Sequence, residues 1–394
     1  MIHLFINALA ASAGGGLTYI RNVVPLMARD PRLKVTVALR RSLHDELHGF
    51  SNVDFVEAEI PPLRRFWYEQ TTLPLTIRRS GADVLLSAGN LAVRKSPVPQ
   101  ILLSRNSLYT SPDFLRDLRD RHKYGTWLDT HLRGYLAKKS IHWAEITVAP
   151  SEAFAAELRR WSGGSVRAVH HGFDRAGFTH GQPLEPGIED QMMKAEGALK
   201  LLFVSHYNYY RNFETLIRAL PILRNRLPER RIRLLLTCKL QEAANPGAYS
   251  PQGAASLVEK LAVSDMVVEL GSVPYRQLYD VYRRADMYVT PAYAETFAHP
   301  LVEAMASGLP VVASDLAVHR EICGDAARYF PRFSPEVLAE NVAQIAGSPE
   351  TSKRMAEAGL ARSGQFSWKH HVESIIELAR DLIERRNVQK KRFT

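Results

Sequence analysis

Two glutamates, Glu295 and Glu303, lie eight positions apart where a predicted strand gives way to a short helix. The apolar run Met287–Thr290 ends at Pro291, which has no N–H for a strand ladder, and Pro300 suits the first turn of a helix. Ligands of open α/β sheets bind beyond the carboxyl ends of parallel strands. Both carboxylates are therefore expected to contact a ligand. Alternatively, Glu303 only complements the helix dipole and Glu295 is a solvated loop residue.

A second group of polar residues follows the predicted strand 200–205. His206, Asn208 and Arg211 lie in one turn before a helical segment. A guanidinium makes bidentate contacts with phosphate and keeps its charge at all working pH values. Arg211 is the expected phosphate contact. The alternative is a surface residue at a helix start, where a cation is electrostatically unfavourable.

Two turns in the first half of the chain are also candidates. Gly15 and Gly16 follow the predicted strand 2–8 and open a helix, so their N–H groups can approach a phosphate or a sugar without side-chain interference. Arg105 and Asn106 follow the predicted strand 100–104. Either side chain is expected to face a ligand cleft.

Alternating strand-like and helix-like runs predict an α/β protein with parallel sheets and helices on both faces. A chain of 394 residues exceeds what one core usually supports, which predicts two domains, at 1–175 and 176–374. A terminal helix over about 375–394 is expected to pack back on the first domain. Residues 173–198 are rich in Gly, Pro and Glu, lack periodicity and are predicted to hold the linker. The expected strands are 2–8, 34–39, 84–87, 100–104, 146–149 and 166–170 in the first domain and 200–205, 233–237, 266–270, 287–290 and 311–314 in the second.

The sequence from Glu295 onward resembles the family 4 retaining glycosyltransferases, which have a GT-B fold and typically read E-G-F-G-x-P-x-x-E-A-M-A-x-G-x-P-V-V. The chain departs from this E-x7-E motif at Thr296 and Ala298, where the family usually has glycine, and the added β-carbons put the usual orientation of the donor sugar in doubt. The matching residues are Glu295, Phe297, Pro300, Glu303, Ala304, Met305, Ala306, Gly308, Pro310, Val311 and Val312.

The resemblance implies two Rossmann-like domains whose parallel sheets face a central cleft, the first binding an acceptor and the second a nucleotide-diphosphate sugar. It is strongest to bacterial cell-surface glycan enzymes, which implies a saccharide or lipid-linked saccharide acceptor. The implied catalytic residues are Glu295, Arg211 and Asn106, the last in a region where many relatives have a histidine. The implied donor contacts are Gly15, Gly16, His206, Asn208, Arg211, Glu295, Thr296, Phe297, Ala298 and Glu303, with Glu303 on the ribose.

The sequence has no D-x-D motif at a strand end, so neither a metal nor another cofactor is expected. Arg211 and the helix N-termini would stabilise the leaving diphosphate. Glu295 would provide negative surroundings for the oxocarbenium-like sugar. The family further implies a same-face mechanism in which the departing phosphate oxygen takes the acceptor's proton.

The net charge of +10 is concentrated in the first half of the chain, where residues 1–175 hold 24 Lys plus Arg against 16 Asp plus Glu. Cations and aromatics mix over Arg64–Tyr68 and Arg116–Lys139, which predicts a surface for anionic lipid headgroups or an ordinary solvated basic surface. No nucleic-acid module is visible, so no nucleic-acid partner is expected. Two isolated cysteines and no apolar run of membrane-spanning length predict a cytoplasmic protein, peripheral on the inner face of the membrane where the basic surface binds it.

Three other functions remain open from the sequence. A nicotinamide-dependent oxidoreductase would use the glycine turn at 14–16, but it would leave Glu295, Glu303 and Arg211 unexplained. A catalytically silent, membrane-associated scaffold would use only the basic surface. A nucleotide-sugar epimerase or a glycogen-type phosphorylase shares the GT-B architecture and is the nearest enzymatic alternative.

Overall fold

The chain forms two compact units in the computed structural model, which describes residues 1–11, 14–47, 49–50, 52–245 and 249–392. The first unit contains Met1–Thr110, His122–Gly172 and the segment from Ser367 onward. The second contains Ser111–Arg121 and Phe173–Phe366. The short segment Ser111–Arg121 thus belongs to the second unit, although the chain on both sides of it belongs to the first.

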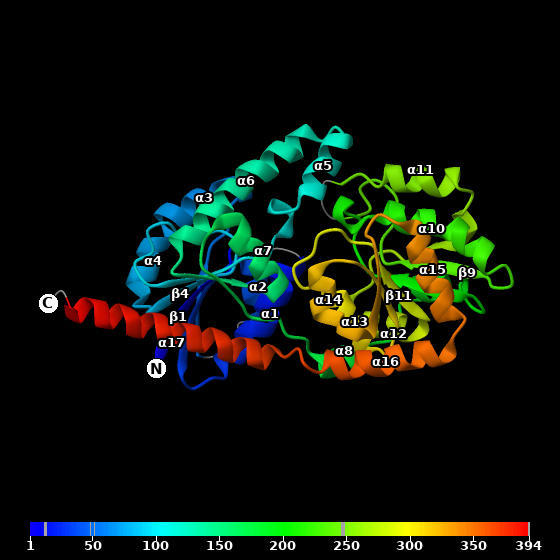
Figure 1. Cartoon of the computed structure of the whole chain (residues 1–394). Helices are drawn as coiled ribbons and strands as arrows, with labels where there is room; N and C mark the ends of the chain where they lie inside the picture. The colour runs from blue at the N-terminus through cyan, green and yellow to red at the C-terminus, as the bar shows by residue number, and fades with distance from the viewer. Residues whose placement is uncertain (12–13, 48, 51, 246–248, 393–394) are drawn as a thin grey trace. The chain divides into compact units, whose positions relative to one another are not determined.

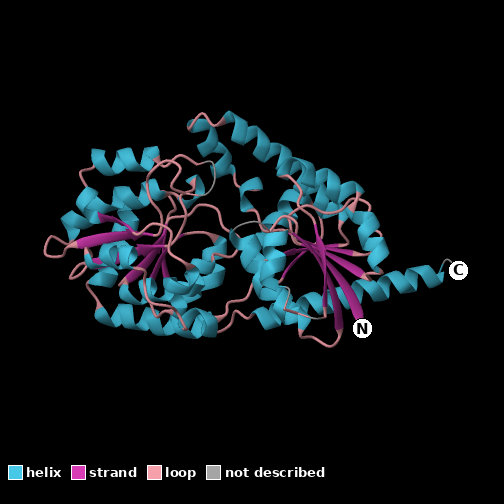
Figure 2. Cartoon of the chain, turned by 180° about the vertical axis from the view of Figure 1, so that it is seen from behind, coloured by secondary structure: helices cyan, strands magenta, loops and turns pink. Residues whose placement is uncertain are grey.

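The first unit is a parallel sheet of seven strands with helices on both faces (Figures 1 and 2). Its strand order is β3-β2-β1-β4-β5-β6-β7. The strands are β1 Ile2–Asn7, β2 Leu33–Leu39, β3 Val53–Glu57, β4 Val84–Ser87, β5 Gln100–Leu103, β6 Ile146–Ala149 and β7 Val166–Ala168. The helices are α1 Gly14–Ala28, α2 Arg41–Leu47, α3 Pro62–Thr71, α4 Leu73–Ser80, α6 Tyr124–Trp143, α7 Glu152–Ser162 and α17 Trp368–Arg392, with the 3-10 helix η1 at Ser107–Tyr109.

The second unit repeats the architecture with a six-stranded parallel sheet in the order β10-β9-β8-β11-β12-β13. The strands are β8 Leu199–Phe203, β9 Ile232–Leu236, β10 Val267–Glu269, β11 Met287–Thr290, β12 Val311–Ser314 and β13 Ala327–Phe330. The helices are α5 Pro112–Asp120, α8 Arg175–Thr179, α9 Pro186–Met193, α10 Phe213–Arg226, α11 Gln252–Lys260, α12 Tyr275–Arg284, α13 His299–Ala306, α14 Ala317–Cys323, α15 Pro335–Ala346 and α16 Pro349–Ser363, with 3-10 helices η2 Tyr209–Arg211, η3 Ser264–Met266 and η4 Gly324–Ala326.

The central strands agree with the sequence prediction because they are buried on both faces and read as continuous apolar runs. The edge strands β3 and β13 were not predicted. Each is four or five residues long and carries charged side chains, as edge strands often do, so neither shows a buried apolar pattern.

The predicted linker 173–198 is wrong in its local structure, because α8 and α9 form there. Phe178, Ile188 and Met192 are buried. Arg284 on α12 makes a bidentate ion pair with Glu189 on α9, with N–O distances of 2.6 and 2.9 Å. These short helices are therefore part of the second unit.

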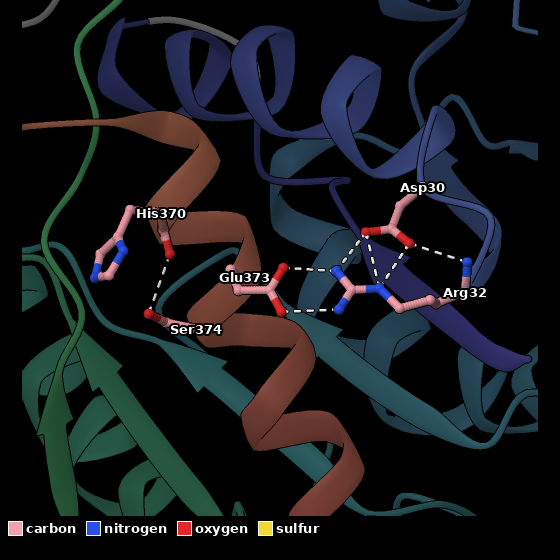
Figure 3. A network of polar contacts seen from close by, with 5 residues as sticks. All are labelled: Asp30, Arg32, His370, Glu373 and Ser374. Carbon is pink, nitrogen blue, oxygen red and sulfur yellow. Dashed lines mark hydrogen bonds and ion pairs between the residues drawn. The ribbon is translucent and has the colours of Figure 1, made fainter.

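Helix α17 completes the core of the first unit. Ile375, Ile376 and Ala379 are buried in the same apolar cluster as strands β1, β2 and β4. At the surface, Arg32 joins Asp30 to Glu373 on α17, as Figure 3 shows, with N–O distances of 2.6 and 2.8 Å to Glu373. Because Arg32 and Glu373 are both substantially exposed, burial rather than this ion pair is the main force that holds the helix.

Both sheets have a point at which the strand order reverses. It lies between β1 and β4 in the first unit and between β8 and β11 in the second. Ligands of doubly wound sheets bind outside the carboxyl ends of the strands at this switch point. The loops that the sequence selects, after β1, β8 and β11, all begin at these two positions.

Candidate active site

The centre of the site in the second unit is an ion pair between Arg211 and Glu295. Arg211 ends η2 after β8, and Glu295 lies in the loop after β11. The exposed fractions of their side chains are 20% and 9%, so neither the surface reading of Arg211 nor the solvated reading of Glu295 holds. Burial raises the pKa of Glu295, but the charge of Arg211 and the hydrogen bonds from Arg211 and Thr296 outweigh it, and the net shift is downward. Glu295 is therefore a carboxylate at neutral pH.

Backbone contacts hold the two loops of this pair together. The N–H of Tyr293 donates to the carbonyl of Tyr210 at 3.0 Å. Asn212, in a left-handed conformation with φ of +55°, donates its amide to the carbonyls of Pro291 and Arg332 at 3.0 and 2.6 Å. The turn after β8 and the loop after β11 are thus fixed to each other beside the ion pair.

His319 is a site residue that the sequence reasoning missed. It lies in α14 with no exposed surface, and its Nδ1 donates to the carbonyl of Ser314 at 2.9 Å. Burial lowers the pKa of His319 despite the opposing charge of Glu295, so the ring is neutral with Nε2 as an acceptor. That buried Nε2 has no hydrogen-bond partner among the described residues. No spacing rule in the sequence marks a histidine in this helix.

Glu303 lies in the second turn of α13 and is 6% exposed. Tyr282, on α12, donates its hydroxyl to Glu303 Oε2 at 2.9 Å. Burial raises the pKa of Glu303 to about 7, although the Tyr282 hydrogen bond opposes the shift. Glu303 is buried and lies outside the first turn, so the alternative that it only complements the helix dipole does not hold. Tyr282 was not singled out from the sequence.

The loop that leads into α13 has a glycine-like backbone conformation at one of its two departures from the family pattern, Ala298. Ala298 is left-handed, with φ of +62° and ψ of +64°, a conformation that favours glycine. The N–H of Thr296 donates to its neighbour Glu295 at 3.1 Å. Phe297 is buried against Phe366 with the rings 5.3 Å apart. The departure from the family pattern at Ala298 thus falls on a strained position.

His206 and Asn208 occupy the turn after β8, as predicted. The Asn208 amide lies 3.4 Å from the His206 carbonyl. Partial burial and the charge of Arg211 lower the pKa of His206. A neutral His206 beside Arg211 can bind a ligand only as a hydrogen-bonding group, so Arg211 is the principal cation of this turn.

The switch point of the first unit is built around Arg105. Its guanidinium donates to the carbonyls of Gly15 and Ala88, both at 2.7 Å, and its Nε is buried without a partner among the described residues. Burial lowers the pKa of Arg105 to about 10. A β-carbon at Gly16 would lie 3.5 Å from the Arg105 guanidinium. Arg105 therefore stabilises the glycine turn through its hydrogen bond to the Gly15 carbonyl.

Asn106 caps η1 rather than standing free at the strand end. Its Oδ1 accepts the N–H of Leu108 at 3.0 Å. Another polar residue of this edge, the buried Glu69 on α3, accepts a hydrogen bond from Asn7 at 3.3 Å. Burial raises the pKa of Glu69 to about 7. Apart from being a carboxylate in a basic, aromatic segment, Glu69 has no feature in the sequence that marks it.

Among the described residues, no group of three or more His, Cys, Asp or Glu side chains is arranged to hold a metal ion. The second unit brings together Arg211, Glu295 and His319, with Glu303 on the adjoining helix. Such a set can pair with an anionic ligand through Arg211 and accept hydroxyl groups through the two carboxyls. Gly15, Gly16 and Asn106 belong to the first unit, where they follow the carboxyl ends of strands β1 and β5.

Comparison with known proteins finds a family match within the second unit. Residues 188–362 match the family model Glycosyl transferases group 1. The matched glycosyl transferases group 1 segment includes Arg211, Glu295, Glu303 and His319 and stops short of the first-unit residues.

Curated relatives match the chain over part of its length. A D-inositol 3-phosphate glycosyltransferase of Segniliparus rotundus is 33% identical over 150 residues, which are 37% of this chain and 32% of the relative. One of Nocardia farcinica is 29% identical over 185 residues, 46% of this chain and 40% of the relative. The chain thus matches about a third to two fifths of the length of these two relatives.

Solved structures match over nearly the whole chain. Sucrose-phosphate synthase from Thermosynechococcus elongatus superposes with a TM-score of 0.73 at 17% identity, covering 98% of this chain and 100% of that one. Anabaena Alr3699/HepE in complex with UDP-glucose gives 0.71 at 16% identity, covering 97% and 100%. The likeness confirms the predicted fold class, an α/β protein of the GT-B type with two parallel sheets.

Proposed function

We propose that the protein is a glycosyltransferase that moves a sugar from a nucleotide-diphosphate donor to an acceptor hydroxyl with retention of configuration. One observation carries the proposal: the group 1 segment places a buried Arg211–Glu295 pair at its switch point, with the carboxyl of Glu303 on the adjoining helix. The oxidoreductase and scaffold alternatives give these buried groups no role.

In the proposed reaction, the second unit binds the donor. Glu303 accepts the two ribose hydroxyls, and Arg211 contacts the diphosphate and stabilises its growing charge as the sugar leaves. Glu295 orients the sugar hydroxyls and supplies negative charge near the oxocarbenium-like carbon. The departing phosphate oxygen takes the acceptor proton on the same face. Arg211 supplies the positive charge, so the proposal requires no metal.

The remaining predicted residues have supporting roles in this proposal. Thr296, Phe297 and Ala298 shape the loop over the sugar. The turn residues His206 and Asn208 contact the phosphates. In the first unit, the turn Gly15–Gly16 contributes N–H groups from the start of α1, and Asn106 contacts the transferred sugar from its place at the start of η1.

The donor base and the acceptor are proposed more broadly. HepE is a solved structure in complex with UDP and with UDP-glucose, which makes a uridine donor our first candidate. The acceptor is proposed to be a saccharide, free or lipid-linked, in a cell-surface glycan pathway. Because the curated matches are confined to part of each relative, their inositol phosphate acceptor is not carried over.

The outer face of α6 supports the proposed attachment to an anionic membrane surface. The helix buries small residues and exposes large apolar ones. Lys138 and Lys139 are exposed on the same helix, and Arg133 pairs with Asp129. Among the described helices, none is long and apolar enough to span a bilayer. The buried residues include Thr130, Gly134, Ala137 and Ser140, and those 59 to 64% exposed are Tyr124, Leu128, Leu132 and Tyr135.

Cosedimentation with vesicles tests this surface. Wild-type protein should bind phosphatidylglycerol-containing vesicles and lose most of that binding on replacement of both Leu128 and Leu132 by Ser. The matched control replaces Met193 and Val388, exposed to a similar extent elsewhere, and should bind as wild type does. Equal binding by both double variants would contradict the assignment of α6.

The function itself is tested with purified full-length chain. Calorimetry against UDP, GDP, TDP and ADP, with and without EDTA, should give selective, EDTA-resistant binding of one diphosphate, weakened by Glu303→Ala and Arg211→Ala. The corresponding sugar nucleotide should then release diphosphate in the presence of a saccharide acceptor, with Glu295→Ala losing turnover more than affinity. A folded protein that binds no nucleotide would contradict the proposal.

A further inference from the structure

Helix α5 reaches the second unit from the first half of the chain. The first unit ends at Thr110, Ser111–Arg121 joins the second unit, and the first unit resumes at His122. The helix begins with Ser111, whose hydroxyl accepts the N–H of Phe114 at 3.2 Å, and with Pro112 in its first turn. This is a well-capped helix with specific neighbours, and its neighbours are the loops of the Arg211–Glu295 pair.

The inner face of α5 contacts both of these loops. Phe114 is buried and packs edge-on against Tyr210, the residue before Arg211, with the rings 6.2 Å apart. Asp117 accepts a hydrogen bond of 2.7 Å from the hydroxyl of Tyr293, and Tyr293 lies two residues before Glu295. Tyr293 and Tyr210 are themselves joined by their backbones. One face of α5 therefore contacts the chain next to each member of the ion pair.

A partly buried charge network holds α5 in this position. Arg121 donates to Asp117 at 2.7 Å and to Glu214 on α10 at 2.9 Å, and it lies over the ring of Tyr209 at 4.3 Å. At the other end of the helix, Asp113 accepts from Arg332 at 2.8 Å. The backbone carbonyl of Arg332 in turn accepts the amide of Asn212, beside the ion pair. Charge-assisted bonds of this kind are directional and stronger than neutral ones.

We propose that α5 is a brace that fixes the loops carrying Arg211 and Glu295, and that Asp117 is its positioning residue. Asp117 is suited to this role because one oxygen accepts from Arg121 and the other from Tyr293, so it joins the α10 side of the network to the loop after β11. Among the described residues, no hydrogen bond or ion pair joins Asp117 to Arg211 or Glu295, so its effect passes through Tyr293.

The brace deepens the proposed function and rests on it for its catalytic consequence. Transfer requires Arg211 and Glu295 to be held within a fraction of an ångström of their working positions. The chain that enters α5 comes from η1, which Asn106 caps in the first unit.

Hydrogen exchange measured by mass spectrometry on the full-length chain without ligand tests the brace independently of activity. Asp117→Ala and Tyr293→Phe should each speed exchange in residues 291–298 by about tenfold, as expected for the loss of one charge-assisted hydrogen bond. Asp117→Asn keeps an acceptor for Tyr293 and should restore most of the protection. The double variant should equal Asp117→Ala, because that change already removes the Tyr293 hydrogen bond together with the Arg121 ion pair.

The kinetic measurement uses the same variants with the sugar nucleotide that the wild type turns over. Asp117→Ala should lower kcat about 10-fold to 100-fold while KM changes less than about threefold, since the nucleotide contacts are intact. Asp54→Ala, which removes a carboxylate from the ion pair with Lys34 in the first unit, away from both proposed binding surfaces, should change neither. If the wild type transfers no sugar, the proposed function fails and the exchange experiment alone decides the brace. Unchanged exchange in both single variants would overturn the brace, whatever the activity.

Discussion

In the second unit the buried guanidinium of Arg211 is paired with a carboxylate, whereas in the first unit the guanidinium of Arg105 rests on two carbonyl oxygens. Both arginines lie at the switch point of a parallel sheet. Among the described residues, no carboxylate bonds to Arg105. Glu69, at the same edge of the sheet, has its pKa raised to about 7, as burial disfavours its charge.

The difference is that the buried cation of the second unit has a carboxylate partner, whereas the buried cation of the first unit has none among the described residues. In the second unit the charges of Arg211 and Glu295 compensate each other, so both stay ionised in a buried place and are ready to interact with a polar ligand. In the first unit Arg105 supports the glycine turn structurally. The family model likewise matches residues of the second unit and not of the first.

The largest expected effect comes from removing the two arginines in turn. Arg211→Met should lower the free energy of unfolding by about 3 to 5 kcal/mol, because Glu295 is left as a buried, unpaired carboxylate. Arg105→Met should cost only about 1 to 2 kcal/mol, since the loss of two hydrogen bonds is partly offset by removing a cation whose burial is already unfavourable. Urea denaturation of both variants gives the comparison.

The combined variant Arg211→Met, Glu295→Gln is the control for this experiment. It removes both charges together and should recover part of the stability lost in Arg211→Met. If Arg105→Met proved the more destabilising of the two single changes, the two edges would not differ in the way described.

The pH dependence of Glu303 gives an intermediate effect. Its pKa in the folded chain, about 7, lies above its ordinary value of 4.5, so the folded state binds a proton that the unfolded state has lost between these two values. The free energy of unfolding should therefore fall as the pH rises from 4.5 to 7, by at most about 3 kcal/mol, and level off above. Glu303→Gln should remove this component.

Nucleotide affinity should move in the opposite direction over the same region. Ionised Glu303 accepts ribose hydroxyls better than the protonated acid does, so the affinity for a nucleoside diphosphate should rise as the pH passes 7. Calorimetry from pH 5.5 to 8.5 on wild type and Glu303→Gln separates this from ionisation of the diphosphate, which both proteins share. Parallel profiles for the two proteins would remove Glu303 from the nucleotide contacts.

The smallest effect is expected at Ala298. Ala298→Gly should raise the free energy of unfolding by about 0.5 to 1 kcal/mol, because glycine adopts the observed φ of +62° without the clash of a β-carbon. Ala304→Gly, within α13, should instead destabilise the protein by about 1 kcal/mol or more. Thermal denaturation of the two variants, run side by side, checks both signs. A loss of stability in Ala298→Gly would show that the left-handed conformation is not strained.

The elements of the fold that could be predicted are those whose residues form a local apolar pattern in the sequence. Central strands such as Met287–Thr290 and Val311–Ser314 were predicted with their observed bounds. The assignment of α5 to the second unit could not be predicted, because it depends on partners such as Glu214 and Tyr293, about 90 to 180 residues away along the chain.

The site was predictable where residue type and spacing both carry information. Arg211, Glu295 and Glu303 lie at strand ends or on the helix that follows, and the structure brings the first two into direct contact. Nothing in the sequence indicated that Arg211 would pair with Glu295. His319 and Tyr282 escaped notice because a single histidine or tyrosine on an apolar helix has no distinctive pattern, and only tertiary packing brings them to the carboxylates.

The path of α17 has a consequence for synthesis of the chain. Its residues complete the apolar core around β1, β2 and β4, yet they follow the whole second unit in the sequence. On the ribosome, the first unit therefore emerges with part of this apolar core uncovered until residues 367–392 have been made. Apolar surface that is transiently exposed during synthesis makes a chain prone to aggregate. The first unit is synthesised first but its core is completed last. Chaperones are therefore expected to bind these uncovered apolar residues before α17 packs against them.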